Sequence, residues 1–186
     1  MANKDYMAFR PAMLRNGSPY NGSFSKFYAG ENLFLGDLVE LGATGTASGS
    51  GAYRQVDRAG TGDSIVGIVV GWEYAPATLS DKYCRSGNVV YVADTSNLIL
   101  EGQTASTGLA AADVGLNVDF VVTAAGDTTT GESGYEINDG TEAVTATLDL
   151  KIVGMVDRPD NTVGGANMKV LVMTNKNYNT DQTLGV

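Results

Sequence analysis

Residues 145–153, TATLDLKIV, carry the pattern on which the fold prediction depends. Leu148, Leu150 and Ile152 fall on one face of an extended chain, and the polar residues between them fall on the other. Because successive side chains of a β-strand point to opposite faces of a sheet, this alternation predicts an antiparallel strand with one buried and one solvated face.

Similar short apolar runs recur along the chain, separated by Gly, Asn and Asp, as strands separated by turns should be. Strands are predicted at 33–41, 52–57, 64–74, 87–93, 97–101, 118–124, 135–138, 143–156 with a possible break, and 168–174. Helical patterns are confined to one turn at 78–83 and a short helix at 109–114. The spacing predicts an all-β fold, an antiparallel β-sandwich or barrel, rather than alternating βα units.

Residues 1–28 differ from the rest of the chain. Pro11, Pro19 and several glycines oppose a continuous helix or strand, which predicts an extended N-terminal arm attached to a single β-rich domain at 29–186. The arm nevertheless holds six of the fourteen Phe and Tyr residues. Aromatic side chains bury large areas, so we expect the arm to lie on its own body or on a partner. The predicted protein-interaction residues are Tyr6, Phe9, Arg10, Arg15, Tyr20, Phe24, Phe27 and Tyr28.

The charge is unevenly distributed. The net charge is −9, of which residues 1–28 contribute +3 and the remainder −12. Between Arg85 and Lys151 there are ten acidic residues and no lysine or arginine. A cationic arm on an acidic body favours self-association or docking on another acidic protein, and the acidic body disfavours nucleic acid. A disordered basic tail is the alternative interpretation.

Catalytic and cofactor chemistry is disfavoured by the residue types present. The chain lacks histidine and has one cysteine, Cys84, so zinc and an imidazole-activated thiol are unsupported. The glycine-rich loop 42–51 lacks the Lys-Ser/Thr of a phosphate-binding loop, which favours a flexible connection. We therefore expect no enzyme, no cofactor, no resident metal, no disulfide and no membrane span. A single cysteine is compatible with assembly in a reducing cytoplasm.

Two sets of acidic residues allow alternatives to a chain without catalytic or metal-binding sites. Val92-Ala93-Asp94-Thr95-Ser96 is similar to an aspartic-protease signature, but Ser96 replaces the glycine, and one copy would act only in a symmetric dimer. An aspartate that begins a turn is the favoured interpretation of Asp94. A weak divalent site between subunits is the second alternative, although solvated loop carboxylates are favoured; its carboxylates would be Asp127, Glu132, Glu136, Asp139 and Glu142.

The order of motifs in the C-terminal half resembles minor virion structural proteins of tailed bacteriophages. The motifs are residues 91–97 (YVADTSN), Glu101 and Gln103, 112–117 (ADVGLN), 130–134 (TGESG), 148–161 (LDLKIVGMVDRPDN) and 169–172 (KVLV) before Asn175. Upstream, residues 36–41 (GDLVEL) and 62–68 (GDSIVGI) look like the β-rich opening of phage head decoration proteins.

This resemblance implies a capsid decoration, or cement, protein that binds the outer head shell and stabilises it against internal pressure. Its implied partners are the major capsid protein and further copies of itself, with a trimer favoured over a dimer because icosahedral shells offer threefold positions. The implied location is the outer surface of the capsid in the virion, and the host cytoplasm during assembly. The alternative is a tail or fibre-associated virion protein whose β-domain binds glycans, with Trp72 and Tyr74 stacking on sugar.

Overall fold

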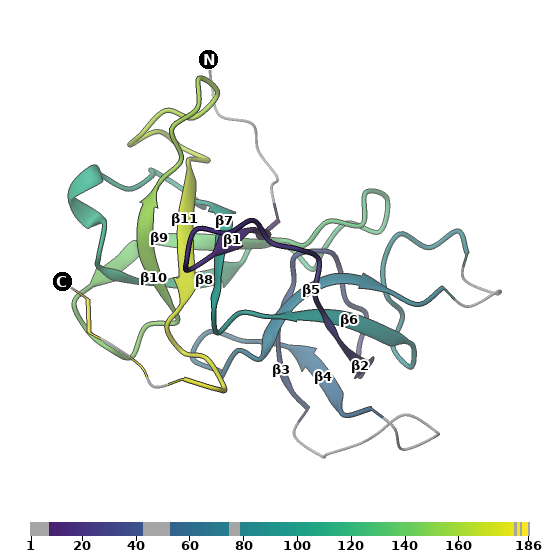
Figure 1. The fold of residues 1–186 in the computed structure, drawn as a ribbon. Helices are drawn as coiled ribbons and strands as arrows, with labels where there is room; N and C mark the ends of the chain where they lie inside the picture. The colour runs from purple at the N-terminus through teal and green to yellow at the C-terminus, as the bar shows by residue number, and fades with distance from the viewer. Residues whose placement is uncertain (1–7, 43–52, 75–78, 181, 183, 186) are drawn as a thin grey trace.

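The computed structural model describes residues 8–42, 53–74, 79–180, 182 and 184–185. Its strands form a closed five-stranded barrel and a six-stranded sheet, which stand side by side in Figure 1. The all-β prediction is therefore confirmed. One short 3₁₀ helix, η2 (Ala111–Asp113), lies within the range in which a short helix was expected. Among the described residues, no helix is long and apolar enough to span a membrane.

The barrel has the strand order β2-β4-β3-β5-β6. Its strands are β2 (Ser25–Ala29), β3 (Leu38–Leu41), β4 (Gln55–Arg58), β5 (Gly67–Trp72) and β6 (Val89–Asp94). β2 pairs in parallel with β4, and the other pairings are antiparallel. Closure of the barrel leaves these strands without a long open edge.

The six-stranded sheet has the order β1-β7-β11-β10-β8-β9. Its strands are β1 (Arg10–Leu14), β7 (Leu98–Gln103), β8 (Asn117–Val122), β9 (Tyr135–Ala143), β10 (Leu150–Met155) and β11 (Lys169–Thr174). An additional bridge joins Thr104 to Ile137, so the sheet curls until β7 and β9 approach each other. The chain passes from the barrel to the sheet between β6 and β7, through residues 95–97 (Figure 1).

A common hydrophobic core joins the two parts. Leu38, Ile65 and Ile68 of the barrel side belong to the same buried cluster as Leu100 and Phe120 of the sheet. A second, smaller cluster fills the interior of the barrel around Val56, Val90 and Trp72. Because the larger cluster draws on both parts, the barrel and the sheet stabilise each other by burying the same apolar surface.

The N-terminal segment differs from the predicted arm. Residues 10–14 form β1, which pairs with β7, and residues 25–29 form β2, which pairs with β6. The described part of residues 1–28 therefore supplies a strand to the sheet and another to the barrel, and residue 28 marks no boundary between two parts. Pro11 is compatible with β1 because an edge strand tolerates a residue without a backbone N–H. Residues 1–7, including Tyr6, lie outside the described residues.

Candidate functional site

The predicted interaction residues fall into separate environments rather than one surface. Phe9 is 1% exposed and belongs to the common core. Its ring lies over β7 at Gly102, where an added Cβ atom would be 2.3 Å from the Phe9 ring, so the glycine makes room for the ring. The prediction of an interaction role for Phe9 is therefore corrected, since its side chain is occupied within its own chain.

Arg10 and Tyr20 lie at a groove between the sheet and the barrel. The groove has a volume of about 350 Å³, and its walls are mostly apolar, including Leu35 and Val70. The Arg10 guanidinium forms an ion pair with the Glu132 carboxylate at 3.1 Å. The side chains of this pair are 58% and 35% exposed, so solvent screens it and its contribution to stability is small.

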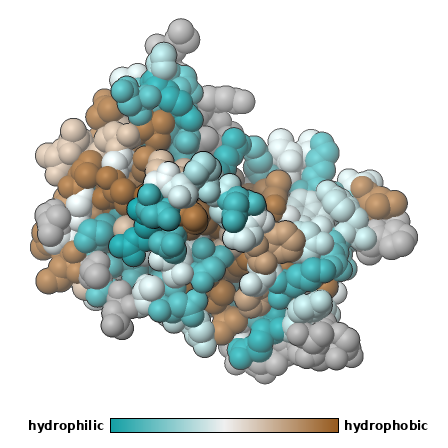
Figure 2. Space-filling view, viewed as in Figure 1, coloured by the Kyte–Doolittle hydropathy of each residue, from teal (hydrophilic) through white to brown (hydrophobic). Residues whose placement is uncertain are grey.

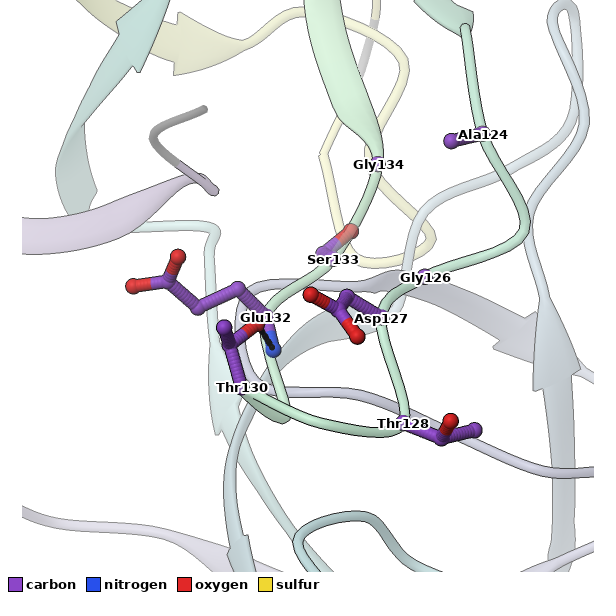
Figure 3. Close-up of a pocket in the computed structure, with 8 residues that line it drawn as sticks. All are labelled: Ala124, Gly126, Asp127, Thr128, Thr130, Glu132, Ser133 and Gly134. Carbon is purple, nitrogen blue, oxygen red and sulfur yellow. Dashed lines mark hydrogen bonds between the residues drawn. The ribbon is translucent and has the colours of Figure 1, made fainter. Parts of the chain in front are cut away.

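A second hollow, of about 410 Å³, adjoins this groove and is formed by the loop between β8 and β9 (Figure 3). The Asp127 carboxylate accepts a hydrogen bond from the Thr129 backbone amide at 2.7 Å, which lowers the pKa of Asp127. Figure 3 shows that the carboxylates of Asp127 and Glu132 point in different directions. Within the described residues, no three acidic, His or Cys side chains are grouped to hold a metal ion.

An aromatic cluster covers part of the outer surface of the barrel. Phe24 is 48% exposed and stacks on Tyr91 of β6, with ring centroids 4.3 Å apart. The Lys26 ammonium lies 5.6 Å from the centre of the Tyr91 ring and forms an ion pair with Glu73. The hydrogen bond to Glu73 raises the pKa of Lys26. We call Phe24, Lys26, Glu73 and Tyr91 the barrel face.

Because side chains alternate along a strand, β2 places some of its residues on the outside of the barrel and others toward its interior. Lys26 is aligned with Tyr91, and Tyr28, two residues further, lies on the same face and is half-buried. Phe27 points the opposite way and packs against the barrel core. Of the predicted residues, Phe24 therefore lies on the barrel face and Tyr28 lies beside it. Phe27 is turned toward the interior of the barrel. Arg15 lies away from both, in the turn after β1.

Tyr91 and Glu73 were missed by sequence reasoning. Gly71 is aligned with Tyr91, and a Cβ atom at Gly71 would lie 3.3 Å from the Tyr91 ring. Alternation within residues 89–94 predicts that Tyr91 faces away from Val90 and Val92, so its outward position could have been predicted. Its contact with Phe24 could not, because the two residues lie far apart in the sequence and no local pattern indicates that they meet.

Trp72 and Tyr74 do not form an exposed platform together. Trp72 is 9% exposed and packs in the barrel core, whereas Tyr74 is 58% exposed. Their ring centroids are 5.8 Å apart with the planes tilted by 57°. A sugar ring placed on this pair would meet Tyr74 alone.

Asp94 has the role of a turn-forming residue. Its carboxylate accepts a hydrogen bond from the backbone amide of Ser96 at 2.8 Å, which closes the turn between β6 and β7. Its other oxygen lies 3.5 Å from the Asn179 side-chain nitrogen. Asp94 therefore begins a turn, as the favoured interpretation of the sequence predicts, and this turn connects the barrel to the sheet.

A buried ionic cluster ties the barrel to the loop that forms the second hollow. Asp37 is fully buried, accepts a hydrogen bond from the Phe34 amide at 2.8 Å, and lies 3.6 Å from Arg58 Nε. The Arg58 guanidinium also lies over the Tyr135 ring and donates to the Ala125 carbonyl at 3.1 Å. Burial raises the pKa of Asp37 to about 6. These contacts span three segments and give the cluster a structural role.

Cys84 provides a separate test of thiol chemistry. Its side chain is fully buried, and burial raises the pKa of the thiol to about 12. Because the thiolate is the reactive form, we expect native Cys84 to resist alkylation by iodoacetamide at neutral pH and to react once the chain is unfolded. Mass spectrometry of the native and denatured protein measures this difference, and rapid modification of the native thiol would contradict it.

Comparisons with protein-family models, with curated proteins and with solved structures gave no match.

Proposed function

We propose that this chain is a capsid decoration, or cement, protein of a tailed bacteriophage. It binds the major capsid protein on the outer surface of the head shell and stabilises the shell through protein–protein contacts. The observation that carries the proposal is the order of motifs from residue 91 to residue 175, which resembles minor virion structural proteins. The all-β architecture is compatible with this role, because a barrel and a sheet offer broad, rigid surfaces.

The barrel face is the surface to which we assign shell contact. Phe24 is a ring exposed on one side and fixed by Tyr91 on the other, so little side-chain freedom is lost when a partner covers it. The half-exposed Lys26–Glu73 pair beside it provides polar contacts at the rim. An apolar anchor with a polar rim is the usual composition of a protein–protein contact.

The energy available from this face fits a protein used in many copies. Covering an exposed aromatic side chain such as Phe24 contributes about 1.5–3 kcal/mol before the cost of ordering is subtracted. Such a contact is weak for one molecule. A self-associated protein on a repetitive shell gains avidity, since each bound copy holds its neighbours at high effective concentration.

Replacing Phe24 by serine is expected to weaken binding to empty shells of the same virus by roughly tenfold or more, because the aromatic anchor is lost. Co-sedimentation over a range of protein concentrations measures the apparent affinity. The matched control is Tyr178→Ser, which removes an aromatic side chain of similar exposure, 59%, outside the barrel face.

Both variants are expected to keep the wild-type circular dichroism spectrum, since both side chains are exposed. If Phe24→Ser bound shells as tightly as wild type, the assignment of shell contact to the barrel face would be wrong. If the wild-type protein itself failed to sediment with shells, the decoration function would be wrong.

A further inference from the structure

The outer face of the six-stranded sheet carries an apolar stripe. Met13, Ile99 and Met173 are aligned across β1, β7 and β11, and Leu171 lies two residues from Met173 on the same face. Val170 and Val172, which alternate with them, point into the common core. Met13, Leu171 and Met173 are half-buried and are not part of either core cluster of the described residues. Figure 2 shows hydrophobic residues gathered over β10 and β11.

A β-bulge adds a further apolar side chain to this stripe. The register between β10 and β11 shifts between Ile152 and Gly154, so Val153 has no aligned partner on β11. Its side chain is 36% exposed. A bulge bends its strand and can redirect a side chain, which here leaves Val153 exposed on the sheet. We call Met13, Val153, Leu171 and Met173 the sheet patch.

One end of the sheet patch is cationic. Arg15 and Lys151 line a hollow of about 340 Å³ together with Met173 and several polar side chains. The Lys151 ammonium donates to the Leu184 carbonyl at 2.6 Å. Within the described residues, neither Arg15 nor Lys151 forms an ion pair. Two cations beside a hollow, on a chain of net charge −9, are suited to receive a carboxylate.

The opposite end of the patch presents a carboxylate. Asp160 is 64% exposed and lies 3.4 Å from Arg158 Nε and 3.8 Å from Lys169 Nζ. Lys169 lies on β11 two residues from Leu171 and on the same face. Arg158 also pairs with Glu101, which is aligned with Leu171. The charges at this end are therefore fixed beside the stripe.

We propose that the sheet patch is the contact surface for a second copy of this chain. A twofold axis that runs across the strands, near Leu171 and Val153, places the two patches face to face with their strands reversed. Asp160 of each copy then faces Arg15 and Lys151 of the other. A face of this kind is complementary to itself, as a twofold contact requires.

The dimensions are compatible with this arrangement. Lys151 and Met155, which lie near the two ends of β10, are four positions apart, or roughly 13 Å at the rise of a β-strand. Reversal of the strands exchanges these two ends while Val153 and Leu171 remain central. The contact gives a dimer in place of the trimer expected from icosahedral positions, and it leaves the barrel face free to bind another protein.

The mass of the purified protein tests this inference without shells, so it can fail independently of the proposed function. Light scattering over a range of concentrations is expected to approach twice the monomer mass of 19.4 kDa. Val153→Asp places a charge at the centre of the contact and is expected to weaken dimerisation by roughly tenfold or more. The matched control, Val122→Asp, changes a valine that is 40% exposed outside the patch and should remain dimeric.

Charge reversal tests the orientation of the two copies. Arg15→Glu and Asp160→Lys are each expected to weaken dimerisation, and the double variant is expected to recover most of the lost affinity, because opposite charges face each other again. Melting temperatures of the variants show whether the fold is retained. A wild-type monomer at all concentrations, a trimer, or a double variant weaker than both single variants would overturn the proposal.

Discussion

Phe9→Ala is expected to lower the free energy of unfolding by about 3–5 kcal/mol, the usual cost of removing a fully buried aromatic side chain. Phe9 is 1% exposed, and its ring contacts β7 at Gly102 within the common core. Truncation leaves a cavity that the rigid β-strands around it cannot fill. Chemical denaturation with urea, followed by circular dichroism, measures the loss.

The matched control for this change is Phe24→Ala. Phe24 is 48% exposed and mainly loses its stacking contact with Tyr91, so a cost below about 1.5 kcal/mol is expected. If Phe9→Ala unfolded at the same urea concentration as wild type, the segment before β1 would not belong to the core. The N-terminal residues would then behave as the disordered tail that is the alternative interpretation of the sequence.

The second large effect is a loss of stability between about pH 4 and pH 7, which arises from Asp149. This carboxylate is fully buried between the sheet and the β4–β5 turn of the barrel, where the Gly62 amide donates to Oδ1 at 3.0 Å. Burial, together with the negative charge of Asp119, raises the pKa of Asp149 to about 7, against the opposing effects of Gly62 and Lys176.

The sign follows from proton binding. An unfolded aspartate has a pKa of about 3.9, so between that value and about 7 the folded chain binds a proton that the unfolded chain has lost. Stability is therefore highest at acidic pH within this range and falls as the pH rises through it. Asp37, with its pKa raised by burial to about 6, acts in the same direction.

Asp149→Asn is expected to reduce this pH dependence and to raise the melting temperature at pH 8, since the amide is uncharged and can still accept a hydrogen bond from Gly62. The shift should be about 2–4 °C for each kcal/mol gained. Melting curves between pH 5 and pH 8 measure it. Asp157→Asn, at an exposed carboxylate outside the sheet patch, should keep the wild-type slope. A variant of Asp149 with an unchanged slope would contradict the raised pKa.

The strands that follow residue 29 were predictable because short apolar runs, some of them alternating with polar residues, lie between Gly, Asn and Asp residues. The prediction at 97–101 corresponds to β7, and that at 168–174 corresponds to β11. Their exact ends differ by a few residues, since pairing with neighbouring strands determines where a ladder stops. The predicted strand at 143–156 is shorter in the structure, where β10 begins at Leu150 and contains a bulge at Val153.

Three features depended on contacts that no local pattern contains. β1 and β2 were missed because Pro11 and the glycines near them indicate an irregular segment, while an edge position makes Pro11 acceptable. Asp149 was predicted to face solvent, yet the turn at Gly62, eighty-seven residues away, covers it. The aromatic residues of the first 28 positions indicated burial, but the sequence alone did not distinguish the core from a partner.

Electron cryomicroscopy of empty shells incubated with the protein tests the decoration function, because it shows both binding and orientation. We expect added density on the outer surface of the shell, in regular positions, with the barrel face toward the major capsid protein. Shells without added density, or density attached through the six-stranded sheet, would contradict it.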